Sequence, residues 1–401
     1  MRLHAIALFC LLVGCSQNPP APQAATPPYM VVLDAGSSGT RVYVYEIQTP
    51  KNHQDVPVII HKGSCKSPDP RCTSVDFNSA QGIHALAGQE QKNMDAYLAP
   101  AIAYAKASIP PHFISDTQIL LMATAGLRNS TIKTQEELIS QTQKSLKKTF
   151  QHAQASIISG FSEGVYAWLD LNLSLKSLGK PWQETYGIIE MGGASQQITF
   201  ATNNQSNSFP IQILGSRYQL YSYSYNQLGA NQASHIQDHG QELEGCMAPD
   251  INYQRCQDHW TQLLKNRFDC GPFCGLLGVQ QPPVPEDMHF KIIGGTPYHI
   301  AQSCQIPYFD ASHIDRLAEP VCSLQSNPCP DYQGNPAYLC KLLSLLRVEL
   351  FGNNQDFPGF GFSPQSTQIT SMALENNDIE VSWTRGLVLA TLLGISPDHN
   401  L

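Results

Sequence analysis

Apolar and polar positions along the chain predict an alternation of buried strands and amphipathic helices. Residues 30–34 form an apolar run that ends in an acid, residues 35–40 are rich in glycine and serine, and apolar and polar residues alternate over 41–47. This order is typical of a strand, a tight turn and a returning antiparallel strand. A further apolar run at 118–123 predicts another buried strand.

Helices are predicted where apolar residues gather on one helical face. This spacing is found over 134–150 and again over 165–173. It also predicts a helix at 339–351 and a closing helix at 386–393, with a strand at 379–383 before the closing helix. Strands that alternate with helices are typical of the α/β class of folds.

One short pattern occurs twice, about one domain apart. Residues 32–37 and 188–193 both consist of two apolar residues, an acid, any residue, a glycine and a small residue. A returning strand is predicted after the second copy, at 196–200. Two diverged hairpins of one kind predict a duplicated α/β fold, in which two lobes face each other across a cleft.

These patterns also predict the extent of each lobe. We expect lobe I at 30–162, completed by the C-terminal helix 385–401, and lobe II at 163–384. Residues 245–340 are rich in cysteine, proline and glutamine and show few clear periods. We therefore interpret 245–340 as a disulfide-tied insertion in lobe II.

The N-terminus has the pattern of an export signal. Arg2 precedes an apolar segment at 5–13, which is too short to cross a bilayer as a helix. The segment ends in Leu-Val-Gly-Cys15, which resembles a bacterial lipobox whose cysteine becomes the acylated first residue. We expect a signal peptide at 1–15 and a proline-rich linker at 16–29, and thus a protein that is either lipid-anchored or secreted. An ordinary cleavage site nearby is the alternative.

Cysteine usage agrees with export, because ten cysteines remain of the twelve once Cys10 and Cys15 are assigned to the signal. An even count in an exported chain is typical of disulfides. Cys322 and Cys329, like Cys65 and Cys72, are close enough to close short loops, although the sequence does not fix the pairing. A zinc site is the competing interpretation, but no paired C-x-x-C spacing supports it.

Composition narrows the class further. Charged residues are only 14% of the chain, against roughly 25% in typical soluble domains, and glycine and proline number 28 each. Such a chain is loop-rich and resembles proteins found outside the cytoplasm. The net charge of −8 argues against a nucleic-acid polymer as partner, since a nucleic-acid face needs clustered lysine and arginine. We expect a monomer.

Both hairpin turns carry groups that suit phosphate. Glycines let the backbone approach an anion closely, and hydroxyl groups add donors. The candidate phosphate-binding residues are Gly36, Ser37, Ser38, Gly39, Thr40 and Arg41 in the first turn and Gly192, Gly193 and Ala194 in the second. Asp34 and Glu190 precede the two turns, and we expect them to hold a divalent cation, Mg²⁺ or Ca²⁺, through its water ligands.

Two further segments carry candidate chemistry. Thr124, Ala125, Gly126 and Arg128 follow the buried strand at 118–123, where α/β proteins place ligand loops. Arg128 could bind a phosphate through its forked guanidinium, and a solvated surface arginine is the alternative.

A carboxylate in the second of these segments, Glu163, is the candidate general base. We expect Ser162 to cap the helix that continues through Val165 and Trp168, which places Glu163 in its first turn. An ionised carboxylate near the cleft can take a proton from a water that attacks phosphorus.

Together these segments resemble the apyrases, or ectonucleoside triphosphate diphosphohydrolases. Residues 34–41, 122–128, 159–168 and 187–197 resemble the first four signature regions of that family in order and spacing, and 222–233 resembles the fifth. The resemblance extends over about 31–393. It implies two actin-like, ribonuclease H-like lobes and the stepwise hydrolysis of nucleoside triphosphates and diphosphates without a phosphoenzyme.

The resemblance also implies roles for single residues. Glu163 becomes the base, and Ser195 and Gln197 hold the attacking water. Tyr298 falls where a base-stacking tyrosine is expected, and Phe360 and Phe362 are the alternative stacking residues, although lone aromatic residues more often belong to the core. The sequence departs from the family pattern at Glu190, where the family has aspartate, and at Gln196, where it has threonine.

Two rival functions remain open at the level of sequence. One is another hydrolase or kinase of the same fold, such as an exopolyphosphatase or a sugar kinase. The other is a catalytically weak lipoprotein that binds nucleotides or host surfaces, which the changes at Glu190 and Gln196 would permit.

Overall fold

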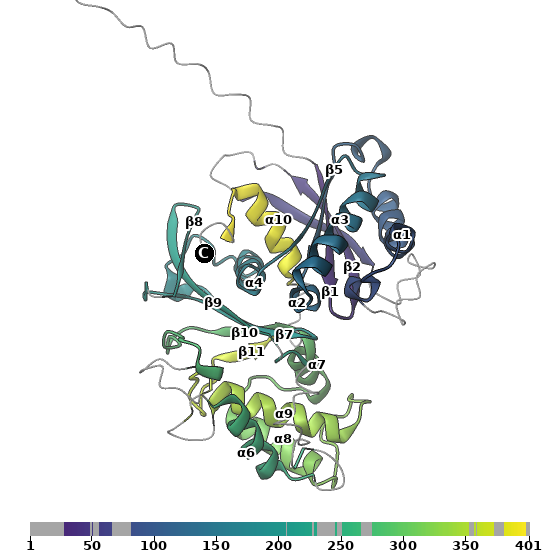
Figure 1. Cartoon of the computed structure of the whole chain (residues 1–401). Helices are drawn as coiled ribbons and strands as arrows, with labels where there is room; N and C mark the ends of the chain where they lie inside the picture. Colours follow the sequence, from purple (N-terminus) through teal and green to yellow (C-terminus); the bar gives the residue numbers. More distant parts are fainter. Residues whose placement is uncertain are drawn as a thin grey trace, which may run out of the picture.

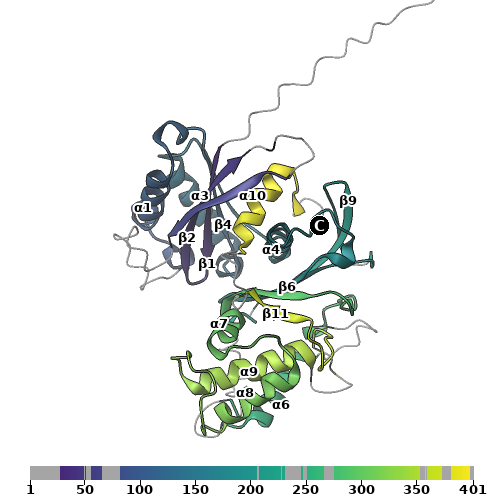
Figure 2. The same ribbon diagram turned by 180° about the vertical axis from the view of Figure 1, so that it is seen from behind.

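Two β-sheets with helices packed on them form the molecule in the computed structural model. The described residues are 28–48, 50, 56–65, 82–205, 207–226, 228–230, 245–246, 251–265, 275–352, 357, 359–372 and 381–397. The expected signal peptide, Cys15 and almost all of the linker lie outside these residues. Figure 1 and Figure 2 show the two sheets in separate halves of the molecule.

The first sheet has five strands in the order β3-β2-β1-β4-β5. The strands are β1 (Tyr29–Gly36), β2 (Gly39–Gln48), β3 (Val58–Cys65), β4 (Gln118–Ala123) and β5 (His152–Ile157). The first three are antiparallel, and β4 and β5 run parallel to β1. Because β1 and β4 are buried on both faces, their sequences are continuous apolar runs rather than alternating ones. Their carboxyl ends, at Gly36 and Ala123, therefore lie side by side.

Helices cover one face of this sheet. They are η3 (Ile83–Leu86), α1 (Gln91–Ser108), η4 (Pro111–Phe113), α2 (Ala125–Arg128) and α3 (Ile132–Lys147). Helix α3 begins at Thr131, whose hydroxyl accepts a hydrogen bond from the backbone of Thr134. Leu138 and Leu146 of α3 pack with Met94 and Leu98 of α1 in a core formed with β1 and β4.

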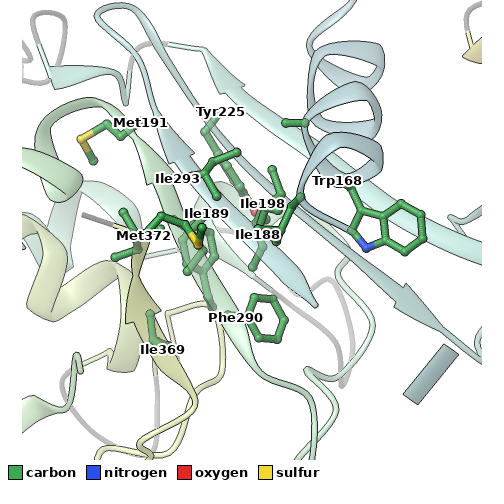
Figure 3. Packing of buried hydrophobic residues seen from close by; sticks show 14 of the residues in the cluster. Trp168, Ile188, Ile189, Met191, Ile198, Tyr225, Phe290, Ile293, Ile369 and Met372 are labelled. Carbon is green, nitrogen blue, oxygen red and sulfur yellow. The ribbon is translucent and has the colours of Figure 1, made fainter. Parts of the chain in front are cut away.

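The second sheet has six strands in the order β11-β10-β6-β7-β9-β8. They are β6 (Gly187–Met191), β7 (Ser195–Thr202), β8 (Phe209–Ile213), β9 (Ser216–Asn226), β10 (Phe290–Gly294) and β11 (Ile369–Ser371), and η5 (Trp182–Glu184) precedes them. Hairpin β6–β7 corresponds to hairpin β1–β2, as the repeated pattern predicted. Figure 3 shows Phe290, Ile369 and Ile188 among the apolar side chains that pack around this sheet.

Helices α4 (Gly160–Ser174) and α10 (Trp383–Leu393) lie next to each other between the two sheets (Figure 1). Buried Asp170 of α4 accepts hydrogen bonds from Arg385 and from the backbone of Ser382. The predicted strand at 379–383 is wrong in its described part. Ser382 instead caps α10, because its hydroxyl accepts from the backbone of Thr384, and Trp383 is already helical.

The remaining helices cover the other side of the second sheet (Figure 1). They are α6 (Tyr253–Leu264), η6 (Leu276–Gly278), α7 (Gly295–Cys304), α8 (Ala311–Cys322) and α9 (Pro336–Phe351). The predicted helix at 339–351 is confirmed and begins three residues earlier. Among the described residues, no helix is both long and apolar enough to cross a membrane.

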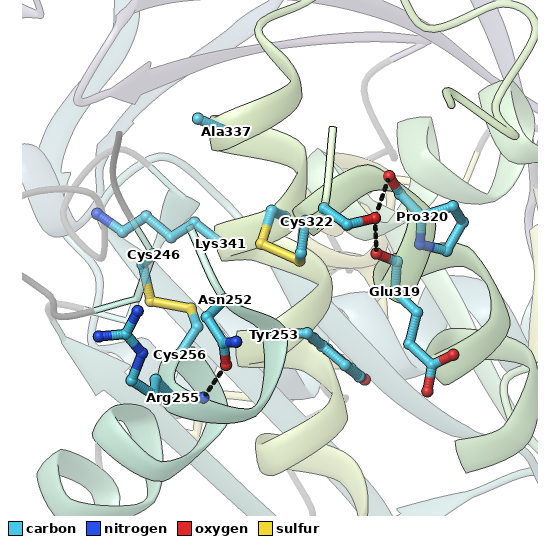
Figure 4. The surroundings of a disulfide bond; sticks show 12 residues. Cys246, Asn252, Tyr253, Arg255, Cys256, Glu319, Pro320, Cys322, Ala337 and Lys341 are labelled. Carbon is cyan, nitrogen blue, oxygen red and sulfur yellow. Dashed lines mark hydrogen bonds between the residues drawn. A yellow bond between two sulfur atoms is a disulfide. The ribbon is translucent and has the colours of Figure 1, made fainter. Parts of the chain in front are cut away.

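Three disulfides tie these helices together within the described residues: Cys246–Cys256, Cys304–Cys329 and Cys322–Cys340. Figure 4 shows Cys246, Cys256 and Cys322 beside α6, α8 and α9. The short loop expected between Cys322 and Cys329 is therefore wrong. Cys322 ends α8 and faces α9, whereas Cys329 pairs with the last residue of α7. The expected Cys65–Cys72 loop lies outside the described residues, except for the backbone of Cys65.

Candidate active site

A cavity of about 780 Å³ lies where the two hairpin turns face each other. Most of the candidate residues line it: Asp34, Gly36, Ser37, Ser38, Arg41, Thr124, Ala125, Glu163, Glu190, Gly192, Gly193, Ala194, Ser195 and Tyr298. They come from both sheets, from the loop after β4 and from the first turns of α4 and α7. The fold thus brings together segments that are more than 100 residues apart.

Five candidate residues do not line the cavity: Gly39, Thr40, Gly126, Arg128 and Gln197. The hydroxyl of Thr40 lies 3.0 Å from the hydroxyl of Tyr97 on α1. Gly126 packs on the first turn, where a Cβ atom at this position would lie 2.7 Å from the Cα atom of Ser37. Thr40 and Gly126 therefore support the loops from behind.

Helix α4 begins one turn earlier than the sequence indicated. Ser159, in an extended conformation, is its N-cap, and its hydroxyl accepts a hydrogen bond from the backbone of Ser162. The expectation that Ser162 caps the helix is wrong, because Ser162 is already inside the first turn and fully buried. Glu163 remains in the first turn, near the positive end of the helix dipole.

Two glycines let the first turns of α4 approach the second sheet closely. A Cβ atom on Gly164 would lie 2.4 Å from the hydroxyl oxygens of Ser222 and Thr199, and one on Gly160 would lie 2.1 Å from the Cβ of Ser224. Over residues 221–225 of β9, Ser222 and Ser224 alternate with tyrosines, so that the serines face the first turns of α4 and the tyrosines face away. This alternation in the sequence indicates a closely approaching element, although it did not single out Ser222 or Ser224 as site residues.

The close packing places the carboxylate of Glu163 in a fixed position. Its Oε2 atom accepts hydrogen bonds from both terminal nitrogens of Arg128, at 3.0 Å each, and from Nε2 of Gln197 at 3.2 Å. No hydrogen bond from the described residues reaches Oε1. One oxygen is therefore held, and the other remains for a ligand in the cavity.

Three opposing effects set the protonation of Glu163. Burial raises its pKa above the ordinary value, the Arg128 guanidinium lowers it, and the Asp34 carboxylate adds to the rise. The ion pair with Arg128 is itself shielded from water, since the two side chains are 12% and 10% exposed. Arg128 thus favours the ionised form that a general base requires.

Ser195 lies beside Glu163 at the start of β7. Its hydroxyl oxygen accepts hydrogen bonds from Nε2 of Gln197 at 2.9 Å and from Arg128 at 3.3 Å. Because both lone pairs of the oxygen are engaged, the hydroxyl hydrogen is left to donate to another group. Gln197 also lies 3.1 Å from the hydroxyl of Ser224 and is fully buried.

The acids that precede the two turns fit a hydrated divalent cation. Oδ2 of Asp34 lies 3.5 Å from Arg41, whereas Oε2 of Glu190 is buried without a hydrogen-bond partner among the described residues. Burial raises the pKa of Glu190 to about 8, and the carboxylates of Glu163 and Asp34 add to the rise. Hard oxygen donors are the ligands that Mg²⁺ and Ca²⁺ prefer. Within the described chain, no three acidic, histidine or cysteine side chains are grouped to hold an ion directly.

Apolar side chains form another part of the cavity wall. Tyr43 of β2, Ile293 of β10, Met372 and Trp383 all line it, together with His299 near Tyr298. The sequence did not single out these residues, because each belongs to an ordinary buried or amphipathic pattern. Phe360 and Phe362 do not line the cavity and pack in the core against Tyr225 and Phe290.

Sequence comparison relates the chain to known nucleotide phosphatases. Residues 22–244 match the GDA1/CD39 (nucleoside phosphatase) family. The chain is 34% identical over 213 residues to probable apyrase 6 of Arabidopsis thaliana, which covers 51% of this chain and 36% of that protein. It is 33% identical over 252 residues to ectonucleoside triphosphate diphosphohydrolase 1 of Mus musculus, with 58% of this chain and 46% of that protein covered. The chain therefore spans less than half the length of these two relatives.

Structural comparison agrees on the fold. A crystal structure of nucleoside triphosphate hydrolases from Neospora caninum superposes with a TM-score of 0.57 at 15% identity, over 91% of this chain and 92% of that one. At this identity the likeness concerns the fold alone. Together with the two mixed sheets and their helices, it confirms the two-lobed, actin-like α/β fold that the sequence predicted.

Proposed function

The chain belongs to the GDA1/CD39 (nucleoside phosphatase) family, and we propose that it is an exported nucleoside triphosphate diphosphohydrolase, an apyrase. It would hydrolyse the terminal phosphates of nucleoside triphosphates and diphosphates and release the monophosphate and orthophosphate. One observation carries the proposal. Glu163 lies in the cavity wall between the two turns, with Oε2 held by Arg128 and Gln197.

The two turns would hold the phosphate chain from opposite sides. Residues 36–38 line the cavity from the first lobe and residues 192–194 line it from the second. Their backbone N–H groups and the hydroxyls of Ser37 and Ser38 are the donors that we propose for the phosphates. The guanidinium of Arg41, which is 40% exposed, can rotate towards a phosphate oxygen. Tyr298 lines the same cavity and is the candidate contact for the nucleobase.

Glu163 and Ser195 together can orient one water molecule. The Ser195 hydroxyl donates to the water oxygen, and Oε1 of Glu163 accepts one of the water hydrogens. This leaves a lone pair of the water free to attack the terminal phosphorus. As the new P–O bond forms, the proton passes to Glu163, and the bond to the bridging oxygen breaks so that the shortened nucleotide leaves with that oxygen.

Asp34 and Glu190 would hold Mg²⁺ or Ca²⁺ through water ligands, and the cation would neutralise charge on the phosphates. The oxygen of Glu190 that is buried without a hydrogen-bond partner among the described residues supports this assignment. Gln197 and Arg128 have a separate role, since they hold the base and Ser195 in register. We therefore propose that Arg128 acts through Glu163 and Ser195. It could bind a phosphate only if its guanidinium gave up its hydrogen bonds to these two residues.

Export is part of the same proposal. Three disulfides among the described residues support an oxidising compartment. We expect a monomer that is either secreted or attached to a membrane by a lipid on Cys15. Labelled fatty acid should enter the wild-type protein and not Cys15→Ser if the anchor exists.

Phosphate release tests the function. Purified protein is incubated with ATP, ADP or inorganic polyphosphate, each with Mg²⁺, with Ca²⁺ and with a chelator. We expect release from both nucleotides that depends on the cation. Release from polyphosphate alone would favour an exopolyphosphatase, and tight nucleotide binding without release would favour a binding protein.

A further inference from the structure

The face of β7 that points away from Glu163 carries a buried polar cluster. We define it as Gln196, Tyr221, Tyr225 and Glu349. All four side chains are at most 2% exposed, and Gln196 and Glu349 are fully buried. Neither carboxylate oxygen of Glu349, neither polar atom of Gln196 and neither tyrosine hydroxyl has a hydrogen-bond partner of ordinary geometry among the described residues. Uncompensated buried polar groups are costly, so their arrangement calls for an explanation.

Register and packing bring the cluster together. Gln196 is paired with Tyr225 across the β7–β9 ladder, and both side chains point to the face covered by α9. Glu349 lies near the end of α9, where its backbone carbonyl accepts a hydrogen bond from Phe360 at 2.6 Å. Phe360 also packs on the ring of Tyr225. The cluster is thus fixed from three elements.

The protonation of Glu349 follows from this position. Burial raises its pKa well above the ordinary value, whereas the amide of Gln196 lowers it. Among the described residues, no cationic side chain is among the groups that act on the Glu349 carboxyl. The titratable side chain that interacts with it is Tyr225 of β9, and burial also raises the pKa values of Tyr221 and Tyr225. Both carboxylate oxygens are fully buried without a hydrogen-bond partner among the described residues, and an ionised carboxylate is costly there, so this position favours the neutral acid form of Glu349.

A neutral acid and a primary amide are complementary. The acid has one O–H donor and a carbonyl acceptor, and the amide has N–H donors and a carbonyl acceptor. Turned to face each other, the two groups can form two reciprocal hydrogen bonds, which their orientation in the structure does not itself show. An ionised carboxylate could only accept from the amide, which would leave the amide oxygen without a donor.

We propose that Glu349 and Gln196 form a neutral acid–amide pair that fixes β7 from behind and so positions Ser195 and Gln197 at Glu163. Ser195 and Gln197 flank Gln196 and point to the opposite face of the strand. Gln196 and Glu349 are positioning residues, since neither lines the cavity. This inference rests on the proposed hydrolysis and extends it to residues remote from the substrate.

Matched variants of Glu349 test the pair. Glu349→Gln keeps a donor and an acceptor, so we expect its kcat to stay within about threefold of wild type. Glu349→Leu keeps the approximate volume but leaves Gln196 without its partner. Because a displacement of about 1 Å can cost about 10²-fold, we expect its kcat to fall by about ten- to a hundredfold with KM almost unchanged. Glu319→Leu, on the exposed face of α8, is the control.

A double-mutant cycle and a pH profile separate positioning from a general structural role. Gln196→Leu combined with Glu349→Leu should lose no more kcat than either single change, because both remove one interaction. At alkaline pH the wild type should lose kcat as Glu349 ionises, and Glu349→Gln should not show that loss. Full kcat in a folded Glu349→Leu protein, or additive losses in the double variant, would overturn the proposal.

If the wild type releases no phosphate, the proposed function is refuted but the Glu349–Gln196 pair is not. Thermal unfolding then tests the pair without any need for activity. The unfolded pKa of a glutamate is about 4.3, and the folded pKa of Glu349 is higher. Its burial therefore destabilises the fold increasingly as pH rises above the unfolded value. The difference in Tm between Glu349→Gln and wild type should grow in favour of the variant over that range. A constant difference would contradict a neutral Glu349.

Discussion

The two hairpins that face the cavity share a pattern but differ in how each acid is compensated. In hairpin β1–β2, Asp34 lies opposite Arg41, which is 3.5 Å away, and a two-residue turn closes the strands. In hairpin β6–β7, Glu190 lies opposite Gln197, and the turn has three residues. Gln197 is uncharged and already donates to Glu163, so it gives Glu190 neither a positive charge nor a free donor.

This difference suits the two hairpins to different roles. The first hairpin carries its own positive charge in the adaptable, partly exposed side chain of Arg41, which suits contact with a variable phosphate chain. The second carries the rigid network of Gln197, Ser195 and Glu163, together with an acid whose pKa is raised to about 8. We therefore expect the second hairpin to depend more strongly on a bound cation than the first.

The largest expected effect comes from the proposed base, Glu163, which Gln197 of the second hairpin holds. Glu163→Gln keeps the shape and the hydrogen bond to Arg128 but cannot accept the proton, so kcat should fall by about 10²–10⁴-fold. Nucleotide binding, measured by the rise in Tm with ATP, should persist. Glu184→Gln on the exposed surface is the control. A rate within about threefold of wild type would mean that Glu163 is not the base.

The second largest loss of activity is expected when Glu190, the acid of the second hairpin, is removed. Glu190→Ala should lower activity by about 10–100-fold, the range typical of residues that support a metal site. It should also lose the rise in Tm that Mg²⁺ or Ca²⁺ gives the wild type, which is a readout independent of turnover. An unchanged response to both cations would remove Glu190 from the cation site.

A subtler change at the same position sharpens the comparison. Glu190→Asp shortens the side chain by one methylene and should change the ratio of rates on ATP and ADP, and the ratio with Mg²⁺ and Ca²⁺, without abolishing activity. Four unchanged rates, together with an active Glu190→Ala, would show that the acid of the second hairpin does not serve the cation.

The guanidinium that stabilises the base should shift the pH profile. Arg128 lowers the pKa of Glu163, and an opposite charge at this distance typically lowers a carboxyl pKa by about 1–3 units. Arg128→Met should therefore move the acid limb of the kcat profile to higher pH, because the base must be ionised. Arg41→Gln in the first hairpin should leave that limb in place. If Arg41→Gln shifted the acid limb and Arg128→Met did not, Arg41 rather than Arg128 would be the guanidinium that lowers the pKa of the base.

The smallest expected effect concerns the contact between α4 and the second sheet. Gly164→Ala places a methyl group against Ser222 and Thr199 and should cost about 1–3 kcal/mol of stability, as overpacking does. It should also lower kcat modestly, since Glu163 precedes Gly164. The free energy of unfolding in denaturant and the rate should fall together. Wild-type values for both would mean that the close approach is not required.

Local pattern was enough to predict the hairpins and most of the cavity wall, because strands, turns and acids are encoded within a few residues. The disulfides were not predictable, since Cys304–Cys329 and Cys322–Cys340 depend on how three helices pack. The cap at Ser159 and the start of α10 at Trp383 depended on a choice between neighbouring residues that could each cap a helix.

The sequence also did not show to which face of its strand each side chain points. Gln196 looked like a change in the active site, yet strand alternation turns it to the face opposite Ser195 and Gln197. The same alternation in β9, with serine towards α4 and tyrosine away, could have indicated a closely approaching helix. It became interpretable only once the position of α4 was known.

Isotope transfer from water tests the central claim most directly. The protein turns over ATP and Mg²⁺ in water enriched in ¹⁸O, and mass spectrometry follows the label in both products. Attack by a water that Glu163 activates predicts the solvent oxygen in the released phosphate, none in the nucleoside diphosphate, and no phosphorylated protein. Label in the diphosphate, a phosphate ester on Ser195, or no release of phosphate at all would contradict the account.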